Sequence, residues 1–469
     1  MSKYKKLLNN TVYFFVGNMG SKLLIFFLVP YYTYVLSTAE YGTADLITTT
    51  ASLIIPVVTL SITEAVFRFS MDEKADYKAL FSNGLLIVCI GGVISFVATK
   101  TLSDKNIAGE VQNFCWILIV AESLYNLAAQ FIRGIGKTRL YAVGGFIQTL
   151  ILVILNIVFL LKLKLGISGY ILAMIISYAC VFLVYAIAGK IYRYVGRWNW
   201  PLLRKMLRYS LPMIPNGLSW WAMSYADKYV ILIFLGAAAN GVYLVAQKIP
   251  TILTMFTTIF HQAWQISAVE EGSNEGKSDF SMSVYDNLQA VMFICTSLII
   301  AIVKPLYAVW VSNDYFEAWE TTPMLLLATV FSCLSQFLTV NYMVDKRTMG
   351  SLKVTLVGCA VNVTLNMLLI PHFGIIAAAT ATFVGYLSTY VVTIFDLKMI
   401  DCISIKKISS SVLTCILQML FLKLPTMYMI LVEIACMIVQ MVMYKSELRN
   451  MQKYGRKICD SVRRKICQK

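Results

Sequence analysis

The apolar residues of this 469-residue chain gather in about fourteen blocks, each long enough to cross a lipid bilayer as a helix. A membrane-spanning helix needs about 20 predominantly apolar residues. The longest polar stretches, residues 190–210, 264–285 and 445–469, are shorter than the roughly 50 residues of a small folded domain. Charged residues make up only 14% of the chain, against about a quarter in soluble domains. The sequence therefore predicts an all-α polytopic membrane protein with about 14 transmembrane helices and no separate catalytic domain.

The chain carries no motif that would predict an enzyme. His261 and His372 lie far apart in the sequence and have no metal-spaced carboxylates beside them. The run from Gly134 to Thr138 resembles part of a phosphate-binding loop but lacks the first glycine, so it predicts a tight cytoplasmic turn. Most of the 11 cysteines lie inside apolar blocks, where cysteine behaves as a small hydrophobic residue. We predict no enzyme activity, no cofactor and no metal site.

The basic residues behind the net charge of +16 lie mostly on one side of the predicted membrane topology. The opening MSKYKK leads into an apolar block with no small-residue cleavage site, which predicts a retained first helix rather than a cleaved signal peptide. When the loops are assigned alternately to the two sides, 31 of the 40 lysines and arginines fall on one side and six on the other. Basic residues accumulate in cytoplasmic loops, so we predict a multi-pass plasma (inner) membrane protein with both termini in the cytoplasm.

The basic C-terminal tail, residues 445–469, also carries regularly spaced apolar residues such as Leu448, Tyr454 and Val462. This pattern favours either an amphipathic helix on an anionic lipid surface or a plain stop-transfer tail. No aromatic or groove-reading motif accompanies the charge, so we predict membrane lipids and no nucleic acid as partners.

The two halves of the chain share a weak internal repeat. Matching positions are Gly42 and Gly241, Gly144 and Gly358, Gly166 and Gly374, Ala173 and Ala381, and Tyr178 and Tyr386. Both repeats begin on the predicted cytoplasmic side, so they are parallel, which is typical of transporters. We predict six-helix lobes over residues 1–200 and 201–400 around a central cavity, two additional transmembrane helices over 401–444, and a basic cytoplasmic tail over 445–469.

Several polar residues fall inside the predicted spans, where a charge costs about 2.5–3.5 kcal/mol and needs a partner, water or a function. The candidates for substrate binding are Lys22, Lys228, Lys248, Asn18 and Trp220. Ammonium groups bind phosphate as point charges. We therefore predict that the three lysines give the central cavity a positive potential suited to an anionic group such as pyrophosphate.

Two acidic residues inside the spans are candidates for binding a coupling ion. Glu122 shares one helix face with Asn126 and Gln130, and Asp227 precedes Lys228 directly. A polar stripe is equally typical of helices that hydrogen-bond to one another. The pair Asp227-Lys228 is likewise compatible with charges that compensate partners elsewhere in the bundle. Both alternatives stay open at this point.

Six stretches carry a distinctive pattern; they run from Gly17 to Lys22, Leu36 to Gly42, Glu64 to Ser70, Arg133 to Thr138, Gly166 to Tyr170 and Asp227 to Pro250. These stretches resemble bacterial oligosaccharide flippases, the polysaccharide-transport branch of the multidrug/oligosaccharidyl-lipid/polysaccharide exporter superfamily. The resemblance covers about residues 8–400. It implies two six-helix lobes, alternating access, and export of undecaprenyl-pyrophosphate-linked repeat units for O-antigen, capsule or exopolysaccharide. By position, Lys22 and Lys228 match the basic residues that meet the pyrophosphate in that family, and polysaccharide polymerase machinery is the implied protein partner.

Two other functions compete with this interpretation. A cation-coupled multidrug exporter of the same superfamily should present unpaired carboxylates in its cavity, whereas lysines are at least as prominent here. A membrane glycan polymerase or ligase needs a large external loop, and the external stretches near 99–111 and 304–320 are short. Many flippases of this branch have twelve spans, so the predicted thirteenth and fourteenth have no role assigned by the resemblance.

Overall fold

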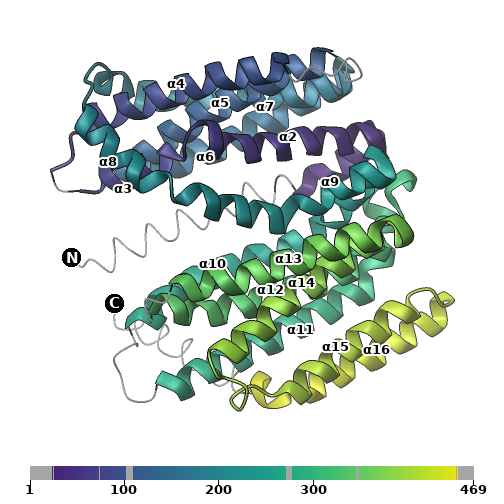
Figure 1. Ribbon diagram of the computed structural model, residues 1–469. Helices are drawn as coiled ribbons and strands as arrows, with labels where there is room; N and C mark the ends of the chain where they lie inside the picture. Colours follow the sequence, from purple (N-terminus) through teal and green to yellow (C-terminus); the bar gives the residue numbers. More distant parts are fainter. Residues whose placement is uncertain are drawn as a thin grey trace, which may run out of the picture. The chain divides into compact units, whose positions relative to one another are not determined.

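The computed structural model describes residues 24, 26–72, 74–101, 109–270, 277–344, 348–449 and 452. Over those ranges the chain is helical and contains no β-strand, as Figure 1 shows. This confirms the predicted all-α fold. The chain forms two compact units, residues 1–244 (unit 1) and 245–469 (unit 2). The lobe boundaries at residues 200 and 400 remain a prediction.

In the part of unit 1 that the structure describes, a helical segment over residues 26–35 is followed by eight α-helices. These are α2 (Thr38–Val58), α3 (Ile62–Ser70), α4 (Tyr77–Thr101), α5 (Gly109–Gly134), α6 (Thr138–Asn156), α7 (Gly166–Ala188), α8 (Trp200–Ser210) and α9 (Met213–Ala246). Helix α6 continues as a π-helix over Ile157–Lys162. Helix α9 extends two residues past the unit boundary.

Local signals explain where two of these helices begin. The Ser37 side chain accepts a hydrogen bond from the backbone N–H of Glu40, and the Glu40 carboxylate accepts one from the backbone N–H of Ser37 at 2.9 Å. This reciprocal capping box satisfies two donors at the start of α2. Asn199 caps α8 in a similar way by accepting from the backbone N–H of Leu202 at 3.0 Å.

Two breaks divide the long apolar segments of unit 1. Between α2 and α3 the chain passes through Leu60 (φ 51°) and Ser61 (φ 48°), both in the left-handed region. Inside α9, Gly236 has φ 84° and ψ 176°, a conformation that only glycine adopts without strain. Residues 237–246 of α9 therefore run in a new direction.

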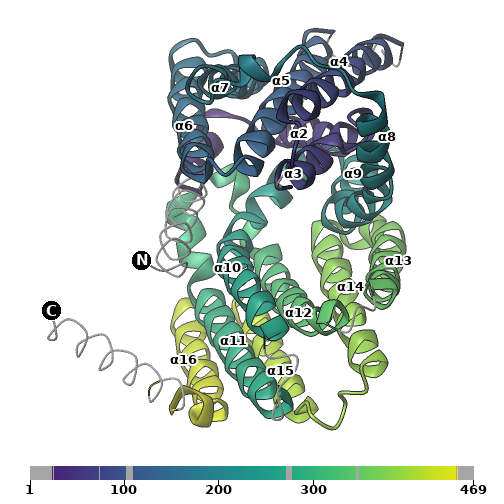
Figure 2. The same ribbon diagram turned by 90° about the vertical axis from the view of Figure 1, so that its left-hand side faces the viewer.

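Unit 2 contains seven helices in the part that the structure describes. These are α10 (Lys248–Glu270), α11 (Lys277–Trp310), α12 (Ala318–Val344), α13 (Thr348–Phe373), α14 (Ile375–Asp396), α15 (Ile405–Phe421) and α16 (Thr426–Met443). The last two form an antiparallel hairpin that lies along α11, as Figures 1 and 2 both show. This hairpin lies within residues 401–444, where the sequence predicts two additional helices, and their crossing of the membrane remains a prediction.

Ten of the described helical segments are long and apolar enough to cross a membrane. The other predicted spans correspond to the segment over 26–35, to α10, and to α15 and α16, which have 17 and 18 residues. The chain is therefore a multi-pass membrane protein. Many large apolar side chains are exposed on its surface, as expected for helices that face lipid.

Aromatic side chains fill the core of each unit. In unit 1 the rings of Phe81 and Phe131 pack with centroids 5.0 Å apart, between α4 and α5. In unit 2 the ring of Phe331 on α12 packs against Phe383 and Tyr390 of α14, at 5.6 and 5.4 Å. Contacts of this kind stabilise a helix pair beyond the area that they bury.

One pair of matched glycines has the same structural role in both units. A Cβ at Gly144 of α6 would lie 2.3 Å from the Tyr185 hydroxyl of α7. A Cβ at Gly358 of α13 would lie 1.9 Å from the Thr389 hydroxyl of α14. Each glycine thus permits close approach between the same two helices of its repeat, since small residues allow helix backbones to come together in membranes.

Candidate functional site

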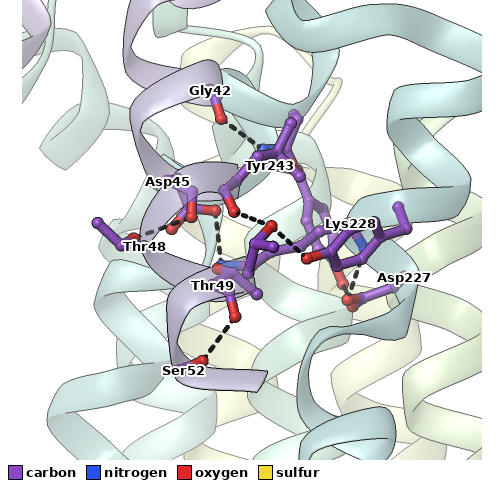
Figure 3. A network of polar contacts seen from close by, with 12 residues as sticks. Gly42, Asp45, Thr48, Thr49, Ser52, Asp227, Lys228 and Tyr243 are labelled. Atoms are coloured by element: carbon purple, nitrogen blue, oxygen red, sulfur yellow. Dashed lines mark hydrogen bonds and ion pairs between the residues drawn. The ribbon is translucent and has the colours of Figure 1, made fainter. Parts of the chain in front are cut away.

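A buried ion pair joins α2 and α9 inside unit 1. The Lys228 ammonium lies 2.7 Å from a carboxylate oxygen of Asp45, and the two side chains are 3% and 12% exposed (Figure 3). Both residues lie within predicted membrane spans. Each charge compensates the cost of burying the other, so the two helices are held together at this point.

Asp227 is the neighbour of Lys228 in sequence but does not bind its ammonium group. Its Oδ1 accepts a hydrogen bond from the backbone N–H of Lys228 at 2.9 Å, and its Oδ2 accepts one from the Tyr243 hydroxyl at 2.5 Å. The break at Gly236 turns the chain so that Tyr243 folds back onto Asp227, sixteen residues earlier. Both carboxylate oxygens of Asp227 therefore already have donors, and the Lys228 ammonium pairs with Asp45.

The same two helices come into backbone contact one turn before Asp45. A Cβ at Gly42 would lie 2.0 Å from the carbonyl oxygen of Ala237, and a Cβ at Gly241 would lie 2.1 Å from the carbonyl oxygen of Thr38. Each helix thus presents a small residue and a glycine four positions apart, and the contact is reciprocal. The Asn240 side-chain amide adds a hydrogen bond to the Gly42 carbonyl at 3.0 Å. We call these residues the glycine contact.

Aromatic residues of α9 line the remainder of its interface with α2. The indole N–H of Trp221 lies 3.2 Å from both the Thr49 carbonyl and the Ser52 hydroxyl. The hydroxyls of Tyr229 and Thr50 are 2.6 Å apart. The interface therefore combines the glycine contact, an ion pair and a strip of polar aromatic residues.

Asp45 was not among the residues predicted from the sequence. It lies only eight positions after Ser37, so it was easily attributed to the polar start of a span. The available signal was its spacing from Gly42, because a carboxylate one turn after an interfacial glycine faces the same partner helix. Of the two alternatives left open for Asp227-Lys228, the structure supports compensation by a partner elsewhere for the lysine.

The other predicted site residues lie in different places. Glu122 is half-buried on α5 and its side chain lies near that of Asn126, as expected for the polar stripe. Lys248 is half-buried at the start of α10 in unit 2. Lys22 and Asn18 lie outside the described residues, and so does the side chain of Trp220, whose backbone belongs to α9.

The arrangement is compatible with exchange of the partner that neutralises Lys228. The ammonium group has one carboxylate at hydrogen-bond distance and the Tyr225 ring 5.1 Å away. An incoming anion that replaced the Asp45 carboxylate would keep Lys228 neutralised. The pair could then open without leaving an isolated buried cation.

Known proteins resemble this chain in fold and, more weakly, in sequence. Lipid II flippase MurJ in an inward closed conformation superimposes with a TM-score of 0.71 and 14% identity, over 93% of this chain and all of the flippase. An inward-facing multidrug resistance MATE family transporter of the MOP superfamily gives a TM-score of 0.63 with 12% identity, over 83% of this chain and 96% of the transporter. These similarities show that the chain has the fold of MOP-superfamily transporters.

Two sequence matches add to the comparison. An uncharacterised membrane protein of Methanocaldococcus jannaschii is 21% identical over 420 residues, which cover 83% of this chain and 97% of the relative. The polysaccharide biosynthesis protein family matches residues 7–264, which is more than half of the chain. The chain therefore belongs to the polysaccharide biosynthesis protein family.

Proposed function

We propose that this protein is a flippase for lipid-linked oligosaccharides. It moves undecaprenyl-pyrophosphate-linked repeat units from the cytoplasmic to the outer leaflet of the plasma membrane, for O-antigen, capsule or exopolysaccharide synthesis. Support comes from the family match, from the fold shared with a lipid II flippase, and above all from the buried Lys228 ammonium on α9. The biased distribution of basic residues supports cytoplasmic termini, and polymerase machinery is the expected downstream partner.

In this proposal Lys228 exchanges Asp45 for the substrate pyrophosphate. Without substrate, the ion pair neutralises the lysine and keeps α2 against α9. The pyrophosphate competes for the ammonium group, and the released Asp45 carboxylate, already the more exposed of the two side chains, moves toward water. When substrate leaves, the ion pair forms again. The exchange links the occupancy of the site to the contact between two helices, which alternating access requires.

The glycine contact has a defined place in this cycle. With both termini in the cytoplasm, α2 begins at the outer membrane face, so Gly42 and Gly241 lie near that face. The contact then closes the outer end of the interface between α2 and α9. Opening the glycine contact must separate the backbones of α2 and α9, which touch because Gly42 and Gly241 have no side chains between them.

The proposal is tested by deleting the gene and measuring lipid-linked oligosaccharide on the cytoplasmic leaflet. We expect the intermediate to accumulate, wild type to clear it, and the double variant Lys228→Met/Asp45→Asn, which leaves no buried charge, to fail at normal membrane abundance. Lys162→Ala is the matched control, because this lysine is exposed at the end of the π-helix that continues α6. Unchanged surface glycan in the deletion strain would refute the flippase assignment.

A cation-coupled multidrug exporter is the second candidate, since a MATE transporter shares the fold and two carboxylates lie near Lys228. Asp45 is neutralised by the lysine, however, and Asp227 accepts two hydrogen bonds. Neither is an unpaired carboxylate available to an organic cation. Sensitivity of the deletion strain to cationic drugs, with normal glycan, would favour the exporter. Glu122 and Asp227 remain the proposed ion-coupling residues in either case.

A further inference from the structure

The hairpin of α15 and α16 contains an acidic residue deep in an apolar helix. Glu433 lies seven residues after the start of α16, about 10 Å along the helix axis. Its side chain is turned away from lipid and is 3% exposed, whereas Ile434 and Leu431 beside it are half or more exposed. The carboxyl group therefore faces the protein.

Gln418 of α15 is the hydrogen-bond partner of Glu433. Its side-chain nitrogen lies 2.6 Å from Glu433 Oε2 and 3.2 Å from the backbone carbonyl of Ser297 on α11. Both contacts are acceptors, so this end of the amide must be the NH₂ group, and its two hydrogens are both used. Gln418 is itself fully buried.

Two acceptors at this site have no donor. Glu433 Oε1 and Gln418 Oε1 are both buried without a hydrogen-bond partner in the part of the chain that the structure describes. An ionised carboxylate can only accept, so it would leave both oxygens unsatisfied, and the amide has no hydrogen left to give. A protonated carboxyl group has one O–H donor. Protonation of Glu433 Oε1 would therefore supply the hydrogen bond that Gln418 Oε1 lacks.

The charged side chains that the structure describes on the helices packed against α16 lie elsewhere or have other partners. Lys407 of α15 forms an ion pair with Glu447 at 2.6 Å. Asp286 of α11 interacts electrostatically with both members of that pair. Lys304 of α11 donates to the Leu422 carbonyl at 2.9 Å. Lys406 is exposed near the first residue of α15, three turns from Gln418.

The titratable groups that do face Glu433 are the thiols of Cys415 and Cys436. Neither provides a positive charge to balance a carboxylate. The environment of Glu433 therefore offers hydrogen-bonding groups but no counter-ion among the described residues.

We infer that Glu433 is a proton-binding site, and that it holds its proton as a neutral carboxylic acid in a reciprocal pair with Gln418. The Gln418 NH₂ donates to Glu433 Oε2, and the Glu433 Oε1–H donates to Gln418 Oε1. One proton thus gives a hydrogen-bond role to two oxygens that otherwise have no donor, and it strengthens the link between α16 and α15. The second hydrogen of the Gln418 amide connects this pair to α11. The inference concerns the C-terminal hairpin and does not depend on the transported substrate.

Infrared spectroscopy of the full chain in lipid bilayers tests this inference directly. At neutral pH the wild-type spectrum minus that of Glu433→Gln should contain a carboxylic-acid C=O band that shifts downward in D₂O. Gln418→Leu should move the same band to higher frequency, because the acid loses its amide partner. Glu447→Gln is the matched control: this glutamate is paired with Lys407, and the acid band should stay unchanged.

A second measurement covers the case in which a variant does not accumulate. Wild type labelled with ¹³C-carboxyl glutamate should show a protonated glutamate band that disappears at alkaline pH, together with a fall in the thermal midpoint. Glu433→Gln, which keeps a neutral side chain, should not show that fall. A carboxylate band in place of the acid band at neutral pH overturns the inference, and its dependence on Na⁺ would identify a metal cation as the occupant.

Discussion

Replacing both members of the Lys228–Asp45 pair should separate its structural role from its role in transport. At 2.7 Å the attraction between two unit charges is about 6 kcal/mol for an effective dielectric constant of about 20, and desolvation of the two ions offsets most of it. Lys228→Met leaves the Asp45 carboxylate buried alone, which costs about 3–5 kcal/mol of stability. Asp45→Asn leaves the Lys228 ammonium group buried alone, and its cost in stability falls in the same range of about 3–5 kcal/mol. The double variant has no buried charge, so we expect its stability within about 1 kcal/mol of wild type.

The assay has two readouts for the same four proteins. Unfolding in mixed detergent micelles, followed by helical circular dichroism, gives the free energies, which should be strongly non-additive. Clearance of lipid-linked oligosaccharide in the deletion strain gives transport, and the stable double variant should be inactive because it cannot bind the pyrophosphate. Wild-type transport by the double variant would refute the role of Lys228 in substrate binding. Equal stability of all four proteins would refute the buried pair.

Three further predictions concern other contacts. Gly42→Ala and Gly241→Ala each drive a methyl group into a facing carbonyl, so spin labels on α2 and α9 should move apart, and the double variant should add little to either single change. Tyr243→Phe removes a hydrogen bond to a buried carboxylate and should cost about 1.5–3 kcal/mol in the same unfolding assay. Burial raises the pKa of Glu447, but hydrogen bonds from Lys407 and the neighbouring Ser446 together lower it by more. The pKa of Glu447 therefore lies below its usual value. Wild type should therefore lose stability as the pH falls through that depressed value, and Glu447→Gln should lose less, as thermal unfolding against pH would reveal.

The sequence predicted the all-α membrane fold because the length and spacing of apolar blocks are set by the bilayer itself. The C-terminal hairpin appeared as predicted because Pro425 and the polar residues around it interrupt two apolar runs. The match between Gly42 and Gly241, seen first as a weak repeat, corresponds to a reciprocal backbone contact. Patterns of this kind can be predicted from the sequence because each reflects a local physical requirement.

The partners of the charged residues could not be predicted in the same way. Lys228 lies beside Asp227 in sequence, yet its ammonium pairs with Asp45, 183 positions away. The choice depends on the break at Gly236, which brings the Tyr243 hydroxyl to Asp227 and so satisfies that carboxylate first. Sequence spacing gives the face of a helix on which a residue lies, but not the helix that covers that face.

The break between α2 and α3 divides the second predicted span into two helices. Leu60 and Ser61 hold left-handed conformations that cost non-glycine residues about 1–2 kcal/mol each, so packing must maintain them. Gly91 of α4 provides this packing, since its missing side chain leaves room for the Val58 carbonyl. Helix α3 is anchored in the aromatic core, while α2 carries the ion pair and the glycine contact. Across the break, hydrogen bonds from the Leu60 N–H to the Val57 carbonyl and from the Ile62 N–H to the Thr59 carbonyl replace the regular i→i−4 pattern. The angle between α2 and α3 is therefore set by the packing on either side and not by one continuous helix.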